Sequence, residues 1–437
     1  MHRIFPSRKA ITKVQASALV VVILVAIIGA SFYISSTSRG PSSVSVSTMT
    51  SVAPLEINIA GIYPLTGTFA IDGQLLMAGA QQAVNEINAQ GGIQALGGAR
   101  LVLRVIDSGS TVDSAVSATQ RLLSQYNISV CAECSYASAL TFAEIPIGMR
   151  NHVPWITLSL ADTITSQQNP WVFDTSPLAS QMAVAAYNNT MKMAAMAGIT
   201  SIRLGLLATT DPSSQAEVVT WASLAKNASI PIVYQDSFQP GIADATTIAL
   251  QIKAAQPNVL LMIVSSAPDN IVVMNALAQQ GVKIAVGPVG GGDYLVLPPI
   301  GQALGSKANG LSTVTYNFPT SRSMPIANQL AKALNVTFIH SLQLQGYSAV
   351  YLFKAAAEYA RSAKGDAIRD ALASMTVTSG PLVNLYPTTT HTIHFVAQGP
   401  GNGYRLQGIT PLMAQWQNGI PVCVYPTDFA TAKLMTP

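Results

Sequence analysis

The chain has 437 residues, of which only 10% are charged, and its formal net charge is +4. Five of its 23 basic residues but none of its 19 acidic residues lie in residues 1–54, so the remainder is close to neutral. This excludes a basic surface for a phosphate backbone and hence a nucleic-acid partner. The remainder, about 380 residues, exceeds the roughly 250–300 residues at which one hydrophobic core stops growing, so two lobes are expected.

A membrane anchor is predicted at the N-terminus. Residues 1–13 carry four basic side chains, and residues 14–34 form an apolar run without any charge. A helix of about 21 residues is roughly 31 Å long, enough to cross the about 30 Å core of a bilayer. Positive charge before the run predicts a cytoplasmic N-terminus and an extracytoplasmic remainder, which describes a single-pass protein of the cell membrane. A cleaved signal is the alternative, although signal peptides have apolar runs of only about 7–15 residues.

A stalk is predicted after the anchor. Residues 35–54 are about half Ser and Thr and contain no acid, a composition that cannot form a core. Sequons for N-glycosylation begin at Asn127, Asn188, Asn227 and Asn335. Four such motifs are compatible with an exported glycoprotein.

The segment after the stalk is the most informative part of the chain. Residues 57–62 form an apolar run short enough for a buried strand, and residues 66–68, Thr-Gly-Thr, break it with turn chemistry. Residues 74–88 show apolar side chains at helical spacing, and two glycines at 91–92 end the helix. A strand, a turn and a helix make the first half of a βαβ unit, and ligands bind at such turns.

Strand-like and helix-like segments alternate along the rest of the chain. The expected strands are residues 101–106, 128–131, 155–158, 202–208, 232–235, 259–264 and 284–286, and the expected helices are residues 112–125, 140–149, 216–226, 245–255, 268–280 and 349–363. Alternation of this kind predicts an α/β protein with two doubly wound parallel sheets. An α-solenoid would need a fixed repeat period, and the sequence has none.

Two stretches carry a resemblance to a known family. Residues 85–93, NEINAQGGI, are close to that family's helix end GxxxAxxxINAxGGI, and residues 415–422, QWQNGIPV, are similar to the way its members finish. The chain resembles the type I periplasmic binding proteins, in particular those for branched-chain amino acids. The resemblance implies two lobes with a ligand cleft between them. It also implies a solute-binding receptor that passes a small polar ligand to the permease of an ABC importer, without a cofactor.

The resemblance also divides the chain between the lobes. It implies three crossings, near Ser176, Phe318 and Thr378. Lobe 1 is then expected at residues 55–176 and 319–377, and lobe 2 at residues 177–318 and 378–437.

Turns after strands of the first lobe are candidate ligand contacts, because N–H groups at helix N-termini attract anionic groups. The candidates are Thr66, Gly67, Ser135, Tyr136, Ser159, Leu160 and Ala161. By resemblance, Ser135 matches a serine that holds the ligand carboxylate, and Ala161 stands where the family has a Thr that meets the ammonium group. Residues such as Ser and Thr also favour caps and turns where no ligand is near.

The candidates of the second lobe are Asp211, Ser266 and Asp293, and Asp293 is the expected partner of a cationic group. By resemblance, Gln215 stands in place of a Tyr that usually forms an aromatic lid. Together with Ala161, this departure predicts weak or absent binding of leucine, isoleucine and valine. The expected ligand is an amide, another polar amino acid-like molecule or a short peptide.

Enzymatic and metal chemistry find no support. The sequence has no P-loop and no G-x-S-x-G elbow. His391 and His394 are an odd number of residues apart in a strand-like stretch, so their rings face opposite ways and no metal site is expected. Two alternatives to the transport receptor stay open. One is a ligand sensor acting through a separate signalling partner, and the other is a surface or adhesive protein with a filled cleft.

The cysteines indicate no zinc or redox site. Cys131 and Cys134 have no second Cys or His pair at suitable spacing. They are expected either as one buried and one loop thiol or as a local disulfide. Cys423 is too distant in sequence to be paired with either.

Overall fold

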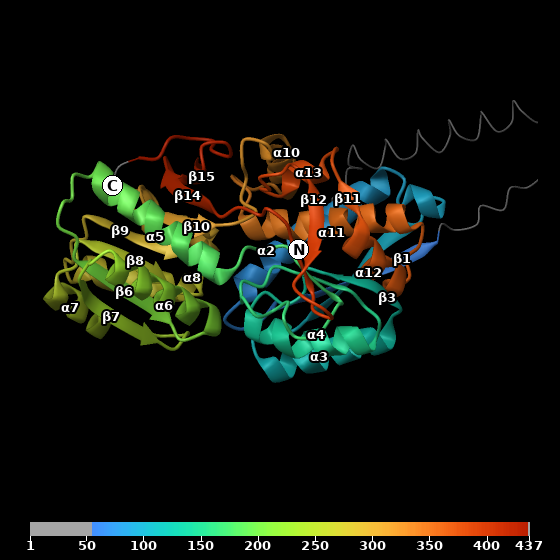
Figure 1. Cartoon of the computed structure of the whole chain (residues 1–437), viewed down its shortest axis with the longest axis horizontal. Coiled ribbons are helices and arrows are strands. Elements are labelled where there is room, and N and C mark those ends of the chain that lie inside the picture. Colours follow the sequence, from blue (N-terminus) through green and yellow to red (C-terminus); the bar gives the residue numbers. More distant parts are fainter. Residues whose placement is uncertain (1–54, 436–437) are drawn as a thin grey trace, which may run out of the picture. The chain divides into compact units, whose positions relative to one another are not determined.

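The computed structural model describes residues 55–435 (Figure 1). The predicted cytoplasmic residues 1–13, anchor at 14–34 and stalk at 35–54 lie outside the described residues. Within residues 55–435, no helix combines the length and the apolar character that crossing a membrane requires. The described residues form two lobes, each built on one β-sheet, which confirms the predicted two-lobed α/β fold.

The first sheet has a parallel core with an antiparallel edge. Its order is β11-β12-β13-β5-β4-β3-β1-β2. The bounds are β1 (Glu56–Tyr63), β2 (Arg100–Asp107), β3 (Ile128–Ala132), β4 (Trp155–Thr157), β5 (Val172–Asp174), β11 (Thr376–Val377), β12 (Ile393–Ala397) and β13 (Tyr404–Leu406). Every residue of β3 is buried, as expected for a parallel strand covered by helices on both faces.

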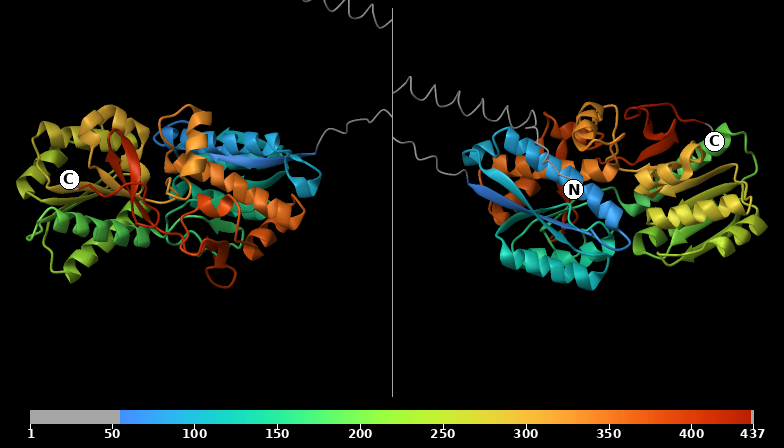
Figure 2. Two further views of the ribbon diagram at one scale, coloured as in Figure 1. Left: turned by 90° about the horizontal axis from the view of Figure 1, so that it is seen from above. Right: turned by 180° about the vertical axis from the view of Figure 1, so that it is seen from behind.

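Helices cover both faces of the first sheet (Figures 1 and 2). They are α2 (Ala70–Ala89), α3 (Val112–Gln125), α4 (Ser138–Arg150), α11 (Ser341–Ala360), α12 (Gly365–Ser374) and the short α13 (Leu382–Leu385), with η1 (Gln94–Leu96) after α2. Alternate residues of β1 belong to different cores. Ile57 and Ile59 pack with α2 and α11, whereas Ala60 and Ile62 pack with α3 and α4.

The second sheet repeats this plan in the order β15-β14-β10-β9-β8-β6-β7. Its strands are β6 (Leu204–Thr209), β7 (Ile232–Phe238), β8 (Val259–Ile263), β9 (Val286–Gly291), β10 (Ser312–Thr315), β14 (Leu412–Gln417) and β15 (Ile420–Tyr425). The helices are α5 (Ala179–Met196), α6 (Pro212–Asn227), α7 (Thr246–Ala255), α8 (Ala267–Gln279) and α9 (Pro298–Leu304), with η2 (Asp293–Val296) and η3 (Gly305–Ala308). α5 and α6 pack against one face, and α7 and α8 against the other. α10 (Met324–Leu334) follows β10 in the sequence and precedes α11.

Two glycines let α2 and α11 approach closely. A Cβ added at Gly79 would lie 1.8 Å from the carbonyl oxygen of Gln343, and one added at Gly346 would lie 2.1 Å from that of Leu76. Neither site has room for a side chain, so glycine is required at this helix crossing for steric reasons.

The chain passes between the sheets three times. The first two crossings lie between Asp174 and Ala179 and after Thr315, close to the predicted positions. The third prediction, at Thr378 with residues 378–437 in the second lobe, needs correction. β12 and β13 extend the first sheet, so the crossing lies between Leu406 and Leu412.

Aromatic packing explains why this hairpin joins the first sheet. The ring of Phe173 on β5 stacks on Tyr404 at 4.9 Å and meets Phe395 edge to face at 5.4 Å. These contacts join residues more than two hundred positions apart, which local sequence patterns cannot predict.

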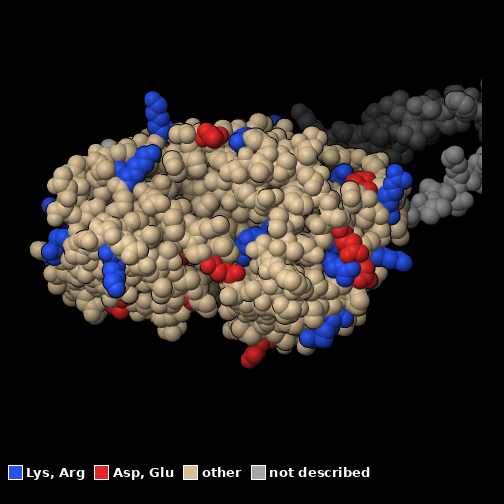
Figure 3. Space-filling view, in the orientation of Figure 1, with Lys and Arg blue, Asp and Glu red and all other residues tan. Residues whose placement is uncertain are grey.

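The surface itself carries few charges, and those in Figure 3 are scattered rather than gathered into a patch.

Candidate functional site

A cavity of about 170 Å³ lies between the two lobes. Both lobes line it at the edges where their parallel strands end and helices begin, which is where open α/β sheets bind ligands. The volume is below the about 300–1,000 Å³ of sites for drug-sized molecules. The cavity therefore has the size for a small metabolite.

The first lobe contributes a largely apolar wall and one uncapped helix end. The lining residues from this lobe are Phe69, Ser110, Val112, Tyr136, Ala137, Ser138, Ala139, Leu140, Leu158 and Leu160. α4 begins here, and its N-cap residue Ala137 has no side chain to satisfy the first N–H groups. The positive end of the helix dipole at Ser138 thus faces the cavity.

The second lobe contributes carboxylates and tyrosines. Its lining residues are Asp211, Pro212 and Ser213 at the start of α6, Ser265 before α8, Asp293 and Tyr294 in η2, and Tyr316 after β10. The Tyr316 hydroxyl donates a 3.0 Å hydrogen bond to the carbonyl of Leu158. This bond joins the second crossing to the first-lobe wall.

Aromatic rings run across the cleft from one lobe to the other. Phe69 and Tyr136 meet edge to face at 5.7 Å, and Tyr136 meets Tyr294 edge to face at 6.5 Å. Such arrangements are favourable for aromatic pairs. The contact of Tyr136 with Tyr294 therefore links the two lobes beside the cavity.

Asp211 is held ionised by its hydrogen bonds. Burial acts to raise its pKa, but hydrogen bonds from Thr209, Ser213 and Ser214 outweigh burial and hold the pKa below its ordinary value. The carboxylate accepts from all three hydroxyls at distances of 2.7 Å, and from the Ser214 N–H as N-cap of α6. This side chain carries a full negative charge at the cavity wall at neutral pH.

Asp293 and Asp72 are more deeply buried. Burial raises the pKa of Asp293 to about 6, although hydrogen bonds from the Ser341 and Thr315 hydroxyls lower it in part. Asp72, on α2, is only 2% exposed, and its Oδ1 has no hydrogen-bond partner among the described residues. Burial raises the pKa of Asp72 to about 8, while the nearby Tyr136 hydroxyl acts to lower it.

The predicted site residues fall into two groups. Tyr136, Leu160, Asp211 and Asp293 line the cavity, whereas Thr66, Gly67, Ser135, Ser159, Ala161 and Ser266 do not. Thr66 donates to Asp107, and the carbonyl of Gly67 accepts from Ala70 within the turn. Ala161 packs in the first-lobe core, and Ser266 caps α8.

Two of these residues lie directly behind the wall. The Ser159 hydroxyl lies 2.9 Å from the Ser138 hydroxyl, which does line the cavity. Ser135 is fully buried in a left-handed conformation, and its Oγ has no partner among the described residues. Gln215, in place of the expected lid residue, hydrogen-bonds to Thr209 and Ser237 instead.

The sequence prediction missed Phe69, Ser110, Val112 and Tyr316. Ser110 and Val112 follow β2, so the strand-end rule used for the other turns would have found them. Phe69 and Tyr316 carry no local signal, because their place at the cavity depends on how the two lobes pack.

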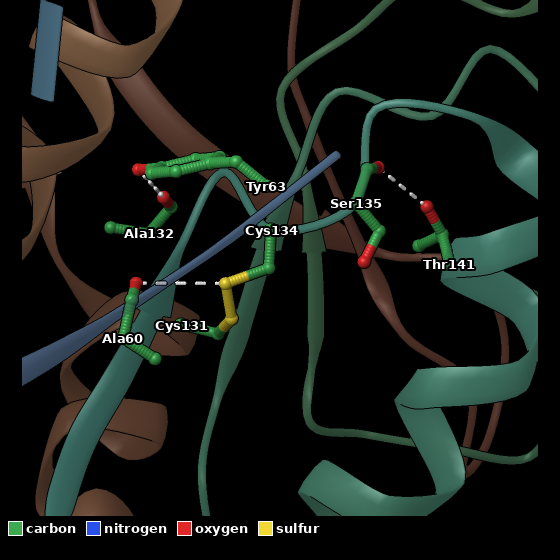
Figure 4. Close-up of a disulfide and its surroundings, with 7 residues drawn as sticks. All are labelled: Ala60, Tyr63, Cys131, Ala132, Cys134, Ser135 and Thr141. Carbon is green, nitrogen blue, oxygen red and sulfur yellow. Dashed lines mark hydrogen bonds between the residues drawn. A yellow bond between two sulfur atoms is a disulfide. The ribbon is translucent and has the colours of Figure 1, made fainter. Parts of the chain in front are cut away.

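A disulfide supports the turn that carries Tyr136. Cys131 at the end of β3 is bonded to Cys134, which confirms the local-disulfide alternative (Figure 4). Ser135 follows directly, donating its N–H to Ile62 and accepting from the Thr141 hydroxyl. The third cysteine, Cys423, is buried and free.

A buried ion pair joins the first and third crossings. Arg405 on β13 lies 2.7 Å from Asp174 on β5, and the exposed fractions of these side chains are 8% and 0%. The same guanidinium donates to the carbonyl of Ser176 at 3.0 Å. The Ser176 hydroxyl in turn donates to Asp174. The pair therefore fixes two of the three segments about which the lobes would move.

Comparisons with known proteins agree with this geometry. A family model described as periplasmic binding protein matches residues 56–399. The Leu/Ile/Val-binding protein homolog 8 of Brucella abortus is 23% identical over 404 residues, which cover 89% of this chain and 95% of the relative.

Solved structures share the fold at low sequence identity. One is the branched-chain amino acid transporter substrate-binding protein of Streptococcus pneumoniae in complex with isoleucine. It has a TM-score of 0.69, 20% identity, and coverage of 86% of this chain and 100% of that one. Another is a solute-binding protein from Rhodopseudomonas palustris in complex with 3,4-dihydroxybenzoic acid. It has a TM-score of 0.67, 16% identity, and coverage of 84% and 96%.

Proposed function

Because the chain belongs to the periplasmic binding protein family, we propose that it is the extracytoplasmic solute-binding receptor of an ABC importer, closing two lobes on a small polar ligand. Members of that family are ligand-binding receptors rather than enzymes. The observation that carries the proposal is the cavity between the lobes, lined by residues of both. A surface or adhesive protein would instead have a filled cleft. A sensor with a separate signalling partner is the second candidate, but no particular contact favours it.

The ligand lies along the wall between the start of α4 and Asp293. The uncapped first turn of α4 and the Ser138 hydroxyl suit a carboxylate or carbonyl oxygen, because a helix N-terminus attracts negative charge. Leu158 and Leu160 offer an apolar surface for the body of the ligand. Asp293 accepts from a donor or cation at the far end, since each of its oxygens has one hydroxyl donor and a remaining lone pair.

The remaining predicted site residues act through these contacts. Ser159 orients Ser138, and the turn of Ser135 holds Tyr136 in place. Ala161 and Gln215, where the resemblance expects a Thr and a Tyr, remove two contacts for an α-amino acid. Weak binding of leucine, isoleucine and valine is therefore part of the proposal, and the preferred ligand is an amide, another polar amino acid-like molecule or a short peptide.

The membrane and surface features belong to the same proposal. Residues 14–34 anchor the chain, residues 35–54 form the stalk, and the permease receives the ligand from the closed lobes. The four sequon asparagines support glycosylation, because Asn127, Asn188, Asn227 and Asn335 are all exposed.

Native mass spectrometry of the full-length chain purified in detergent tests the receptor function. A small molecule is expected to co-purify with the chain. Ala139→Trp, which fills the cavity from an exposed lining position, should abolish co-purification. Ala333→Trp is the matched control, since Ala333 is exposed on α10 away from the cavity. Equal ligand occupancy in both variants would refute the assignment of this cavity.

A further inference from the structure

The charges around the cavity are of one sign. None of the described residues that line the cavity is Lys, Arg or His, whereas two of them, Asp211 and Asp293, are acidic. No ion pair within residues 55–435 involves Asp72, Asp211 or Asp293. The His340 imidazole lies close to this wall, with its Nε2 3.4 Å from the Asp293 carbonyl oxygen. Burial lowers the pKa of His340 to about 3, so the ring is neutral.

The negative charge at this wall is therefore not compensated by the protein. Asp211 is ionised, and all its partners are neutral hydroxyl and N–H groups. The partners of Asp293 are likewise uncharged, namely the Thr315 and Ser341 hydroxyls and the backbone N–H of Tyr316. Burial of a carboxylate is unfavourable unless hydrogen bonds or an opposite charge compensate it, and at this wall only hydrogen bonds do so. A cation that enters the closed cleft would supply that charge.

Aromatic rings add a second feature that suits a cation. Phe69, Tyr136, Tyr294 and Tyr316 line the cavity, and the first three form a chain of edge-to-face contacts. The negative faces of such rings attract ammonium groups. Asp72 on α2 lies near Tyr136, but burial raises its pKa to about 8, so it adds no charge at neutral pH.

The uncapped end of α4 favours an anion, whereas the start of α6 at the same cavity is already capped by Asp211. A helix N-terminus is equivalent to roughly half a positive charge. That is less than the full charge of Asp211, and Asp293 adds to the negative side. The balance disfavours a ligand whose only charge is negative, but it admits a ligand that carries both signs.

Resting on the proposed receptor function, we propose that the ligand carries a cationic nitrogen and that the cleft selects for this group rather than for a carboxylate. The ligand class is an organic ammonium compound with a small apolar body. The nitrogen lies at Asp293 beside the contacting rings of Tyr136 and Tyr294, and the apolar body lies on Leu158 and Leu160. This class differs from the benzoate-like ligand of the Rhodopseudomonas palustris neighbour, whose charge is negative.

Four probes that share a five-carbon 3-methylbutyl skeleton test the inference. Isoamylamine carries only the ammonium group of leucine, 4-methylpentanoate carries only the carboxylate, 4-methylpentanamide is neutral, and leucine carries both charges. Calorimetric titration of the full-length chain in detergent near neutral pH gives their dissociation constants. Isoamylamine is expected to bind about tenfold or more tightly than 4-methylpentanoate, because a charge-assisted hydrogen bond is gained in one case and a repulsion in the other.

One pair of variants assigns the effect to the cavity. Asp293→Asn should weaken the binding of isoamylamine by about tenfold and the binding of 4-methylpentanamide by less, because only the ammonium group loses an opposite charge. Asp370→Asn removes the same charge from an exposed position on α12 and should change neither probe.

The outcomes separate this inference from the receptor function. Binding of 4-methylpentanoate as tight as that of isoamylamine would overturn the inference and leave the receptor standing. This comparison uses the unmodified chain and so does not depend on the folding of Asp293→Asn. If none of the probes binds, the charge of a co-purified molecule decides, and a neutral or anionic one overturns the inference. No binding and no co-purified molecule would overturn the receptor function as well.

Discussion

Replacing Arg405 by Met should reveal how much the crossings depend on one buried ion pair. Arg405 and Asp174 are almost fully buried and lie 2.7 Å apart. Removing one partner of such a pair leaves an uncompensated charge and typically costs about 3–5 kcal/mol. The hydrogen bond to the Ser176 carbonyl, worth about 1 kcal/mol, is lost as well. We therefore expect Arg405→Met to reduce the free energy of unfolding by about 3–5 kcal/mol at neutral pH.

The loss should depend on pH, and its sign follows from Asp174. Burial raises the pKa of Asp174 to about 6, even though Arg405 acts to lower it. The folded state therefore binds this proton more tightly than the unfolded chain. Stability from this group is fully present below about pH 4 and is lost as the pH rises through about 6. Without Arg405 the pKa rises further, so the variant should lose more stability at pH 8 than at pH 5.

Urea unfolding followed by circular dichroism at the two pH values measures this difference. Asp174→Asn combined with Arg405→Met is the matched control, because it removes the charge along with its partner. The double variant should be more stable than Arg405→Met at pH 8, with little difference between them at pH 5. An equal loss at both pH values, with no rescue in the double variant, would refute the account of the ion pair.

Three further predictions concern packing, the disulfide and the ligand. Gly79→Ala should destabilise the chain by several kcal/mol in urea unfolding, because its Cβ would lie 1.8 Å from the Gln343 carbonyl oxygen; a loss below about 1 kcal/mol would contradict the close helix contact. Replacing Cys131 and Cys134 together by Ala should cost about 2 kcal/mol, the chain-entropy value for so short a loop, and an unchanged urea midpoint would contradict a stabilising disulfide. The affinity for isoamylamine should fall as the pH drops below about 6, because protonation of Asp293 removes the charge that holds the cation. An affinity that calorimetry finds unchanged between pH 7.5 and pH 5 would exclude Asp293 as that partner.

The fold could be predicted from sequence where periodicity and turn chemistry agree. The first strand, turn and helix were expected at residues 57–88, and β1 and α2 lie there because the apolar spacing matches the packing. β9 was expected at residues 284–286 but runs over Val286–Gly291. Glycine has low strand propensity, yet a Cβ at Gly291 would lie 1.8 Å from a carboxyl oxygen of Glu217. Tertiary packing overrides propensity at this strand.

The candidate site could be predicted only in part, for a related reason. Tyr136 and Asp293 follow strands, so the strand-end rule placed them at the cavity. Ser135 and Ser159 obey the same rule, but their side chains lie behind the wall, because the direction of a turn side chain depends on backbone conformation that the sequence does not show. The third crossing was misplaced because the contacts of Phe173 with Phe395 and Tyr404 have no local signature.

The hairpin of β12 and β13 has a consequence for folding during translation. β5 remains an open sheet edge until β13 has been made, and 229 residues separate Ser176 from Arg405. At about 5–20 residues per second, that edge stays exposed for roughly 10–50 s of translation. The second sheet also lacks its last strands, β14 and β15, until then, so neither sheet can be completed before the strands between Tyr404 and Tyr425 have been translated. Unpaired edges are templates for wrong pairing, so the nascent chain has its greatest need of a chaperone during this interval.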